Sequence, residues 1–228
     1  GDISGTPIAT TLDSIVTIIA TLDGTTYSKD ISFNYTVADI NYTDFSYVFL
    51  KDVTINDISA NELYSEFTYA QNGGPALPTN LTFDTSGVIS GLPNATILDS
   101  SFNIRATIAN GGLYSKDISL NFTVADISYD LIDLSHVFLK DVAINTVEPN
   151  EVNSTFIYTL TSGSNALPID ISFGETTGDI SGTPRAVILD SSFSITATVP
   201  NTTYSKDISF NFTVADISYD LIDLSHVF

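Results

Sequence analysis

The chain has 228 residues, 43% of them hydrophobic, and carries 27 acidic against 7 basic residues, which gives a net charge of −20. This charge repels nucleic-acid phosphates and anionic lipids, so we expect no nucleic-acid partner and no direct membrane insertion of this segment. The absence of Cys excludes disulfides and thiol chemistry, and the absence of Met predicts a processed product or a segment of a longer protein.

The residue choice favours Ile, Val, Thr, Phe and Tyr, which suit a pleated and half-buried surface. No stretch of the sequence shows a sustained helical period. The most apolar run, residues 15–22, is too short to cross a bilayer. The composition therefore predicts an all-β protein.

Residues 1–40 begin with the turn sequence GDISGTP and end shortly after the alternating stretch YSKDISFNYTV at 27–37. Both sequences return twice, with small changes, further along the chain. Gly-x-Ile-Ser-Gly begins at Gly1, Gly87 and Gly178, and Val-Ala-Asp ends at Asp39, Asp126 and Asp216. A period of roughly 90 residues is typical of one small β-sandwich per repeat.

Strands are predicted inside the repeats wherever apolar and polar residues alternate. They cover 67–69, 81–83, 102–108, 156–160, 171–173, 193–199 and 208–214. In the last of these, Ile208, Phe210, Phe212 and Val214 are expected to point inward. Turns rich in Gly, Pro and Asn follow at 72–75, 90–94, 110–112 and 176–184. Many short strands joined by such turns predict a Greek-key sandwich.

We expect four parts in chain order. Residues 1–40 form the second half of a repeat, 41–127 and 128–217 form complete repeats, and 218–228 form the first strand of a further repeat. The last 25 residues then comprise the closing strand of one sandwich, a short connection and the opening strand of the next.

The stretch ALPIDISFGETTGDISGTP at 166–184, with the two alternating strands after it, resembles the immunoglobulin-like repeats of bacterial and archaeal cell-surface proteins. The pattern recurs at 76–124, and its second half occupies 1–37. The resemblance implies tandem Ig-like or cadherin-like Greek-key β-sandwich domains in an extended array, with an extracellular, cell-surface location.

Cadherin-type domains are a neighbouring family that binds calcium between domains. The sequence ILDSS at 97–101 and 188–192 keeps the Leu-Asp of a cadherin motif and lacks its Arg-Glu. Weak calcium candidates are the carboxylates near the repeat junctions: Asp126, Asp130, Asp133, Asp216, Asp220 and Asp223. Because calcium takes about six to eight oxygen ligands, a solvated acidic connector is the alternative.

Eight Asn-x-Ser/Thr sequons make the chain a candidate glycoprotein: Asn34, Asn41, Asn80, Asn94, Asn121, Asn153, Asn201 and Asn211. Asn34, Asn121 and Asn211 occupy the same repeat position. Alternation predicts that each of these three lies on the solvent face of a strand, where a glycan has room.

Catalytic residues are not expected. The two histidines, His136 and His226, stand at equivalent repeat positions, whereas an enzyme gathers its chemistry in one irregular place. The sequence contains no phosphate-binding loop, thiolate cluster or basic–aromatic stripe. A ligand site would need exposed aromatic residues, for which Tyr64, Tyr129 and Tyr219 are the candidates.

These observations favour a structural, non-enzymatic segment of a repetitive extracellular surface protein, such as an adhesin shaft, stalk, sheath or filament component. Its expected partners are adjacent repeats, copies of itself or another cell surface, and no cofactor is expected beyond weakly bound calcium. Two alternatives stay open. One is a self-assembling filament subunit joined by β-strand exchange between chains, and the other is a carbohydrate- or ligand-binding module.

Overall fold

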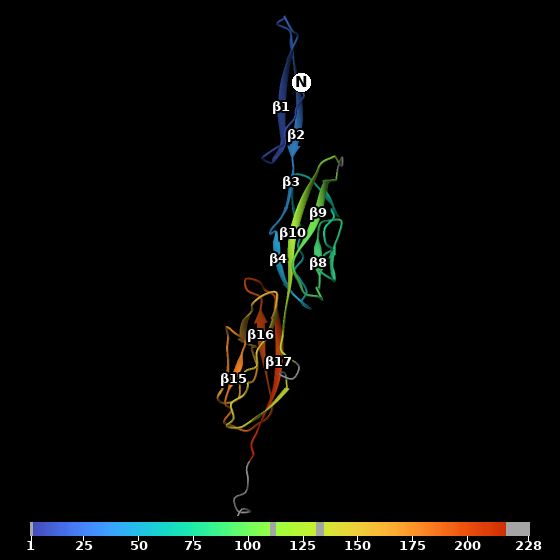
Figure 1. Cartoon of the computed structure of the whole chain (residues 1–228). Coiled ribbons are helices and arrows are strands. Elements are labelled where there is room, and N and C mark those ends of the chain that lie inside the picture. The colour runs from blue at the N-terminus through green and yellow to red at the C-terminus, as the bar shows by residue number, and fades with distance from the viewer. Residues whose placement is uncertain (1, 110–112, 131–134, 218–228) are drawn as a thin grey trace, which may run out of the picture. The chain divides into compact units, whose positions relative to one another are not determined.

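The structure, a computed structural model, describes residues 2–109, 113–130 and 135–217 (Figure 1). All regular elements in these ranges are β-strands, so the prediction of an all-β protein is confirmed. The described ranges hold no helix long and apolar enough to span a membrane. The chain divides into two compact units: residues 1–47, 56–91 and 100–121 form the first, and residues 48–55, 92–99 and 122–228 form the second.

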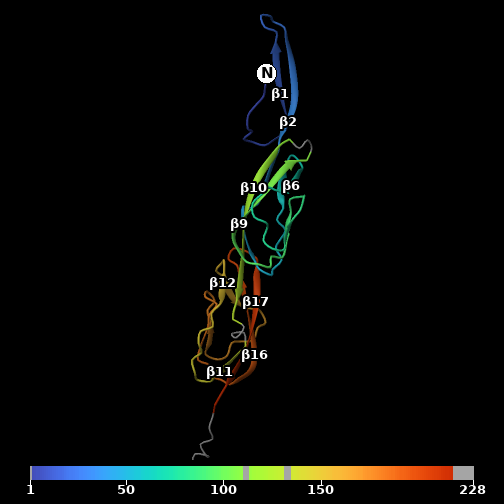
Figure 2. The same cartoon turned by 45° about the vertical axis from the view of Figure 1, so that its right-hand side comes forward.

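The first unit begins with a long hairpin. β1 (Thr11–Thr21) and β2 (Ser28–Val37) pair antiparallel as a two-stranded sheet (Figure 2). Its apolar face is open, with Ile18, Ile31 and Phe33 exposed by 38%, 50% and 37%. In the described ranges no further strand pairs with this hairpin.

Two long strands organise the next part of the chain. A five-stranded sheet has the order β12-β10-β9-β6, with β4 also paired to β10. Its strands are β4 (Ser46–Leu50), β6 (Phe67–Gln71), β9 (Ile97–Ile108), β10 (Ser115–Ser128) and β12 (Asn150–Val152). Two small antiparallel pairs accompany it: β3 (Asp39–Tyr42) with β5 (Ala60–Leu63), and β7 (Leu81–Phe83) with β8 (Ile89–Gly91).

β10 continues past the residue at which the second repeat was expected to end. It runs unbroken to Ser128, and its residues 126–128 pair with β12. The connection expected after this repeat therefore begins as part of β10, because residues 126–128 find backbone hydrogen-bond partners in β12. The repeat boundaries at 127 and 217 stay predictions.

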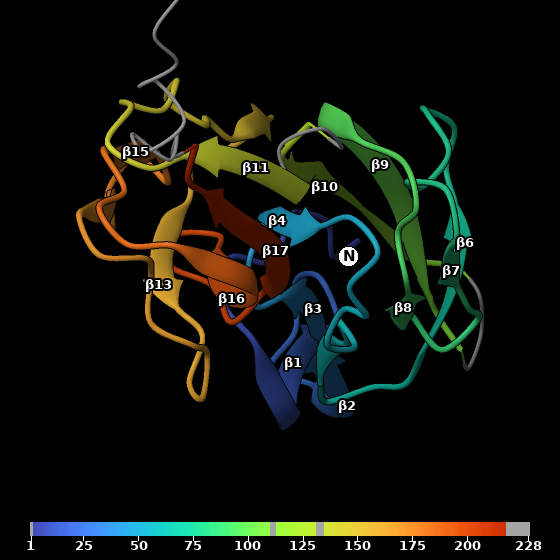
Figure 3. The same cartoon turned by 90° about the horizontal axis from the view of Figure 1, so that it is seen from below.

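The second unit contains a four-stranded sheet of order β11-β17-β16-β13 (Figure 3). β11 (Ser135–Leu139) lies parallel to β17 (Ser205–Ala215), and β16 (Ile188–Thr198) and β13 (Ile157–Leu160) pair antiparallel. β14 (Ile171–Phe173) and β15 (Ile180–Gly182) form a separate pair. These strands confirm the predictions for 156–160, 171–173, 193–199 and 208–214.

One hydrophobic core lies within the second unit. The residues predicted to point inward from β17, Ile208, Phe210, Phe212 and Val214, are all at most 8% exposed. Phe193 of β16 stacks on Phe210 with ring centroids 5.0 Å apart. Burial of apolar area and aromatic contacts together stabilise this sheet. The alternation therefore predicted the buried face of β17 correctly.

The Leu-Asp motif shared with cadherins marks a β-bulge in this chain. The register between β16 and β17 shifts at the motif, where Asp190 has a φ of 48°. The N–H of Asp190 donates a hydrogen bond to Thr213 Oγ1 at 3.3 Å. Asp13 and Asp99 repeat the conformation, with φ of 46° and 48°. Because aspartate tolerates the left-handed region, the repeated residue supports a bend in each strand.

The glycine that ends each Ile-Ser-Gly motif has a left-handed φ. Gly182 has a φ of 139°, and a Cβ at this position would collide with the carbonyl oxygen of Asp170. Gly91 has a φ of 131° and would collide with the carbonyl oxygen of Asn80. Gly5 has a similar φ of 141°, yet no atom lies near its Cβ position. All three glycines therefore have a backbone conformation that is unfavourable for other residues, but only Gly91 and Gly182 also lack room for a side chain.

Gly182→Ala is expected to destabilise the second unit by about 2–4 kcal/mol, because it adds the collision with Asp170 to an unfavourable φ. Gly5→Ala is the matched control, since it carries the same φ without the collision, and should cost about 1 kcal/mol. Differential scanning calorimetry measures both effects. Because Gly182 and Gly5 lie in different units, each variant is compared with the same transition of the unmodified chain, and equal losses of stability would show that the Asp170 carbonyl does not restrict position 182.

Candidate functional site at the repeat seams

Two lysines hold the aspartate that ends the second Val-Ala-Asp motif. Lys51 Nζ lies 2.9 Å from Oδ2 of Asp126, and Lys206 Nζ lies 3.2 Å from Oδ1. Lys206 also donates to the carbonyl oxygen of Ile127 at 3.2 Å, and the Ile127 N–H donates to Asp126 Oδ1 at 2.9 Å. We call Lys51, Asp126 and Lys206 the seam cluster. All three residues belong to the second compact unit.

Neighbouring strands bring the three side chains together. Asp126 lies in β10, and Lys51 directly follows β4, where its N–H donates to the carbonyl oxygen of Ala125 at 2.9 Å. Lys206 is near the start of β17, opposite Ala197 of β16. The two lysines stand 75 and 80 positions from Asp126 in the sequence. The seam cluster is therefore a product of strand register and not of local sequence.

An aromatic contact accompanies the seam cluster. Phe49 and Tyr204 each stand two residues before a cluster lysine, and their rings meet edge to face at 5.8 Å. Phe49 also stacks on Phe122 at 5.8 Å and is 1% exposed. An aromatic pair of this kind contributes about 0.5–1.5 kcal/mol beyond its buried area.

The two lysines keep Asp126 ionised although only 17% of its side chain is exposed. Burial alone would raise the pKa of Asp126, but the hydrogen bonds and charges of Lys51 and Lys206 lower this pKa below its ordinary value. The hydrogen bond from Lys51 to Asp126 in turn raises the pKa of Lys51. Acid and base are therefore both charged at neutral pH.

The equivalent aspartates of the other repeats also meet a lysine. In the first unit, Lys116 Nζ lies 2.7 Å from Asp39 Oδ1, and in the second unit Lys140 Nζ lies 3.3 Å from Asp216 Oδ2. Among the described residues each of these aspartates has one lysine partner. Their side chains are 43% and 42% exposed, against 17% for Asp126. Asp126 with its two lysines is thus a complete cluster. Asp39 with Lys116 and Asp216 with Lys140 are two half-clusters, each with one lysine among the described residues.

Three of the six calcium candidates lie in described ranges. Asp126 and Asp216 contact lysines, and Asp130 accepts a hydrogen bond from Asn150 Nδ2 at 3.0 Å. Within these ranges no three acidic or histidine side chains form a group able to hold a metal ion. The candidates outside the described residues are Asp133, Asp220 and Asp223. In the described part of the chain, the positive charges beside Asp126 are the ammonium groups of Lys51 and Lys206.

The three sequons at the shared strand position differ in exposure. Asn34 of β2 and Asn211 of β17 are exposed, as predicted. Asn121 of β10 is half-buried, so the prediction of a solvent-facing side chain is wrong there. Its Oδ1 accepts a hydrogen bond from Ser101 Oγ at 2.7 Å, and its N–H donates to the carbonyl oxygen of Phe45 at 2.8 Å. A strand beside β10 thus crowds this position.

The remaining sequons lie mainly in exposed positions. Asn153 is half-buried, and its Nδ2 donates to the carbonyl oxygen of Val124 at 3.1 Å. Asn80 and Asn201 have left-handed φ of 69° and 60°. The sequons exposed in this group are Asn41, Asn80, Asn94 and Asn201.

The residues considered for ligand binding or catalysis are mostly structural in the described ranges. Tyr129 is 4% exposed and donates its hydroxyl to the carbonyl oxygen of Gly178 at 2.6 Å, so it is not an exposed aromatic. Burial raises the pKa of the Tyr129 hydroxyl. Tyr64 is 44% exposed, and His136 stacks on Phe138 at 5.1 Å. Tyr219 and His226 lie outside the described residues.

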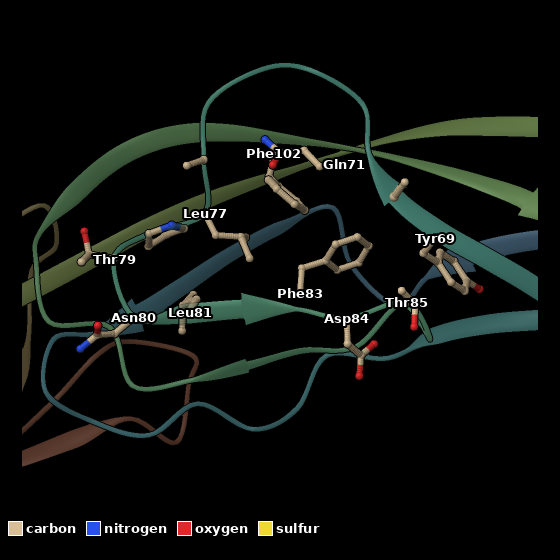
Figure 4. Close-up of a pocket in the computed structure, with 13 residues that line it drawn as sticks. Tyr69, Gln71, Leu77, Thr79, Asn80, Leu81, Phe83, Asp84, Thr85 and Phe102 are labelled. Atoms are coloured by element: carbon tan, nitrogen blue, oxygen red, sulfur yellow. The ribbon is translucent and has the colours of Figure 1, made fainter.

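A surface hollow of about 660 Å³ in the first unit had no clear signal in the sequence (Figure 4). Its floor is apolar, with Phe83 between Leu77 and Tyr69, while Asn80 and Asp84 lie toward opposite ends (Figure 4). Its lining residues come from 69–71, the stretch 76–85 and Phe102, and the sequence marked 76–85 only as part of the repeat pattern.

Sequence reasoning identified the seam aspartates but not their lysine partners. The signal was present, because Phe-Leu-Lys-Asp-Val occurs at 49–53 and 138–142, and Tyr-Ser-Lys-Asp begins at 27, 114 and 204. Each complete repeat thus supplies one lysine near its beginning and one near its end. Recognising the pairing required knowledge of the strand register.

Asp126→Asn is expected to lower the free energy of unfolding of the second unit by about 1–3 kcal/mol at pH 7, because two lysines lose their shared counter-ion. Since the folded state lowers the pKa of Asp126, this stabilisation is present above the ordinary pKa of 3.8 and is lost as the pH falls through the folded value. Denaturant unfolding of both proteins at about pH 7 and about pH 2 measures it.

Asp216→Asn is the matched control for Asp126→Asn. It removes the same charge from an exposed half-cluster with one lysine and should cost less than about 1 kcal/mol. A cost for Asp126→Asn that is the same at both pH values would contradict the ionic explanation.

The model of the family described as "Putative Ig domain" matches residues 41–125 and 138–215. No relative was found among the curated proteins. The solved structures that resemble the chain include an I-band fragment of titin, at 12% identity and a TM-score of 0.39, covering 78% of this chain and 66% of that chain.

Two further structures illustrate the range of matches. The EC1-3 fragment of mouse clustered protocadherin PcdhgC3 is 11% identical with a TM-score of 0.33, covering 92% of this chain and 79% of that chain. An endo-fucoidan hydrolase from glycoside hydrolase family 107 is 16% identical with a TM-score of 0.32, covering 91% of this chain and 35% of that chain. These structures assign no function to the chain. Since the family model covers more than half of its length, the chain belongs to the Putative Ig domain family and consists of tandem Ig-like repeats.

Proposed function

We propose that the chain is a structural, non-enzymatic segment of a repetitive extracellular surface protein, acting as a shaft, stalk, sheath or filament component. The observation that carries this proposal is the recurrence of one junction chemistry, in which a seam aspartate meets a lysine at Asp39, Asp126 and Asp216. A catalytic site needs one irregular arrangement, whereas a load-bearing connection needs the same arrangement at every joint. Repetition of the pairing supports the second role.

Strand continuity at the complete seam supports a joint that resists bending. β10 passes through Asp126 and pairs onward with β12, from Asp126 opposite Val152 to Ser128 opposite Asn150. A continuous paired strand leaves few free backbone dihedrals at the junction. The seam cluster then adds two ion pairs at Asp126, one to each carboxylate oxygen.

The surface chemistry agrees with an extracellular location. The net charge of −20 favours solubility and opposes non-specific association with acidic polymers. Exposed sequons at Asn34 and Asn211 offer strand positions where a glycan would not disturb the core. Adjacent repeats and another cell surface are the proposed partners, and weak calcium binding near the junctions remains part of the proposal.

Single-molecule force spectroscopy tests the mechanical role. Stretching the chain by its ends should give two unfolding events of about 28 nm each, less the end-to-end length of the folded repeat, because each family repeat releases about 80 residues at roughly 3.5 Å per residue. Asp126→Asn should lower the force of at least one event. A smooth extension curve without discrete events would contradict a load-bearing role.

Location requires a separate measurement on cells of the source organism. Antibodies against the chain should label intact cells, and external protease should remove that label. Labelling that appears only after lysis would overturn the proposed surface location.

A second candidate function is a filament subunit completed by strands from another chain, and the open face of the β1–β2 hairpin favours it. Ile31 and Phe33 point to the face that is covered in the other repeats, yet they are 50% and 37% exposed. Such an edge or face is a template for strand addition. The tail expected to supply the strand, residues 218–228, lies outside the described residues.

Phe33→Asp should abolish fibres in negative-stain micrographs if strand exchange drives assembly, because it places a charge in the face to be covered. Thr17→Asp, on the opposite face of the hairpin beside Ser32, is the matched control and should leave fibres intact. Absence of fibres in the unmodified chain would rule out this candidate.

A further inference from the structure

We propose that Glu62 and Glu151 are edge-protecting residues, each of which closes the outer edge of one sheet to a strand from a second copy of the chain. The inference goes beyond the structural role proposed above and does not require it. Each glutamate lies within a stretch that the family model matches, and all of its partners are described residues.

The two larger sheets each end in a short edge strand. β6 is the last strand in the order β12-β10-β9-β6, and β13 is the last strand in the order β11-β17-β16-β13. In the described part of the chain neither of them has a further strand beside it. Such an edge presents N–H and C=O groups that pair readily with another chain, so natural sheets cover or block it.

The outward N–H groups at the β13 edge already have partners. Phe156, directly before β13, donates its N–H to Glu151 Oε1 at 3.1 Å. Tyr158 donates its N–H to the carbonyl oxygen of Glu175 at 3.2 Å. Neither acceptor belongs to β16, so these are the N–H groups that point away from the sheet. A strand approaching from outside therefore finds no free donor at two successive outward positions.

The β6 edge of the first unit is closed in the same way. Phe67 donates its N–H to Glu62 Oε1 at 3.3 Å. Tyr69 donates its N–H to the carbonyl oxygen of Thr85, also at 3.3 Å. One carboxylate and one loop carbonyl thus occupy equivalent positions in both units.

The two edges share a sequence pattern. Asn-Glu-x-x-Ser-x-Phe-x-Tyr occupies residues 61–69 and 150–158. The Glu, Phe and Tyr of this pattern are the residues that meet at each edge. The protection is therefore encoded within nine consecutive residues of each repeat.

The same carboxylate oxygen also accepts the tyrosine hydroxyl. Tyr158 donates to Glu151 Oε1 at 2.6 Å, and Tyr69 donates to Glu62 Oε1 at 2.7 Å. The tyrosines are 1% and 5% exposed, whereas both glutamates are exposed. Burial, followed by the hydrogen bond to the glutamate, raises the pKa of each tyrosine, so the hydroxyl is a donor at neutral pH. A buried ring therefore holds a surface carboxylate at the strand edge.

A glycine fixes the loop that supplies the carbonyl group. Gly178 has a φ of 74°, and a Cβ there would lie 2.8 Å from the ring of Tyr158. Its carbonyl oxygen accepts the Tyr129 hydroxyl at 2.6 Å, and its N–H donates to the carbonyl oxygen of Gly174 at 2.7 Å. The loop therefore lies against the tyrosine ring, with the Glu175 carbonyl at the edge. The first unit uses Gly87, Tyr69 and Tyr42 in the same way.

The β13 edge needs protection more than the β6 edge does. The sequence FIYTLT at 156–161 contains no charge, Gly or Pro, and Ile157 and Leu160 are 53% and 45% exposed. Short uncharged segments of high β-propensity pair with identical segments of other chains. A second copy of the chain is therefore the partner that this edge would take. The corresponding exposed positions of β6 are the polar Thr68 and Gln71.

Sedimentation velocity and thioflavin T fluorescence of the full chain test the protection, with circular dichroism to verify that each variant is folded. Glu151→Ala removes the acceptor shared by Phe156 and Tyr158. It should raise the self-association constant by about tenfold or more, because the freed N–H regains a partner by pairing with another strand. Thioflavin T fluorescence should rise with it. Glu62→Ala should give a smaller rise in both measurements.

Glu175→Ala is the matched control for Glu151→Ala. It removes the same charge beside the same edge, yet it keeps the backbone carbonyl that binds Tyr158. It should leave the association constant within about twofold. Glu151→Gln keeps an acceptor oxygen and should also stay close to the unmodified chain.

A double variant separates strand pairing from a general loss of stability. Glu151→Ala combined with Ile157→Lys places a charge on the exposed side of the edge strand, which blocks strand addition without restoring the lost hydrogen bonds. Its association constant should return to that of the unmodified chain, while its free energy of unfolding should stay at or below that of Glu151→Ala.

A folded Glu151→Ala variant that associates no more than the unmodified chain would overturn the proposal. If that variant does not fold, Tyr158→Phe decides, because it removes the hydroxyl that holds the carboxylate and keeps the ring; unchanged association would then overturn the proposal. Association that persists in the double variant would also overturn it and would place the contact elsewhere. None of these results bears on the surface location of the chain, so this proposal and the structural role can fail separately.

Discussion

The carboxylate of Asp126, shared between two ammonium groups, is the interaction on which the junction depends. Only 17% of this side chain is exposed, so the charge needs compensation inside the fold. Lys51 supplies it from the second repeat, Lys206 from the third, and the Ile127 N–H from the chain itself. The two lysines and the Ile127 N–H all bind the two carboxylate oxygens of Asp126. The loss of either lysine therefore leaves the other paired with a carboxylate that has lost part of its hydrogen bonding and charge compensation.

The positions of the few basic residues mark the seams more clearly than the positions of the many acidic residues do. The chain has 27 acidic and 7 basic residues, and most acidic side chains are spread over exposed positions. By contrast, Lys51, Lys116, Lys140 and Lys206 all stand at seam aspartates. The excess of negative charge is spread over the surface, whereas four of the five lysines are concentrated at the seam aspartates.

Alternation predicted which residues share a face but not whether that face is covered. Phe210 and Phe33 occupy equivalent positions in the same strand pattern, yet Phe210 is fully buried and Phe33 is 37% exposed. The difference arises from the strands that pack over the face, which are a matter of tertiary structure. For the same reason, Tyr129 at a connection was mistaken for an exposed ring although it is 4% exposed.

The seam shows a similar division between local and distant information. Asp126 and Asp216 were recognised as junction carboxylates because the repeat period marks them. They were offered as weak calcium candidates, with a solvated acidic connector as the alternative. Their lysine partners were not foreseen, since the lysines stand 75 to 80 positions away and reach Asp126 only through strand pairing. The Leu-Asp motif recurs in the sequence, but its bulge was missed because the left-handed φ of a residue such as Asp190 can be recognised only from the backbone.

A cation built into the chain behaves differently from one bound from solution. Stabilisation by a bound ion grows with its free concentration and vanishes on dilution. The ammonium groups of Lys51 and Lys206 are held at the junction by the strands that carry them, so their occupancy does not depend on the surrounding ion content. Salt weakens the exposed pair at Asp216 more than the covered cluster at Asp126, because screening acts mainly on charges in contact with water. A junction of this kind is therefore least sensitive to its surroundings where two lysines cover the carboxylate, as at Asp126.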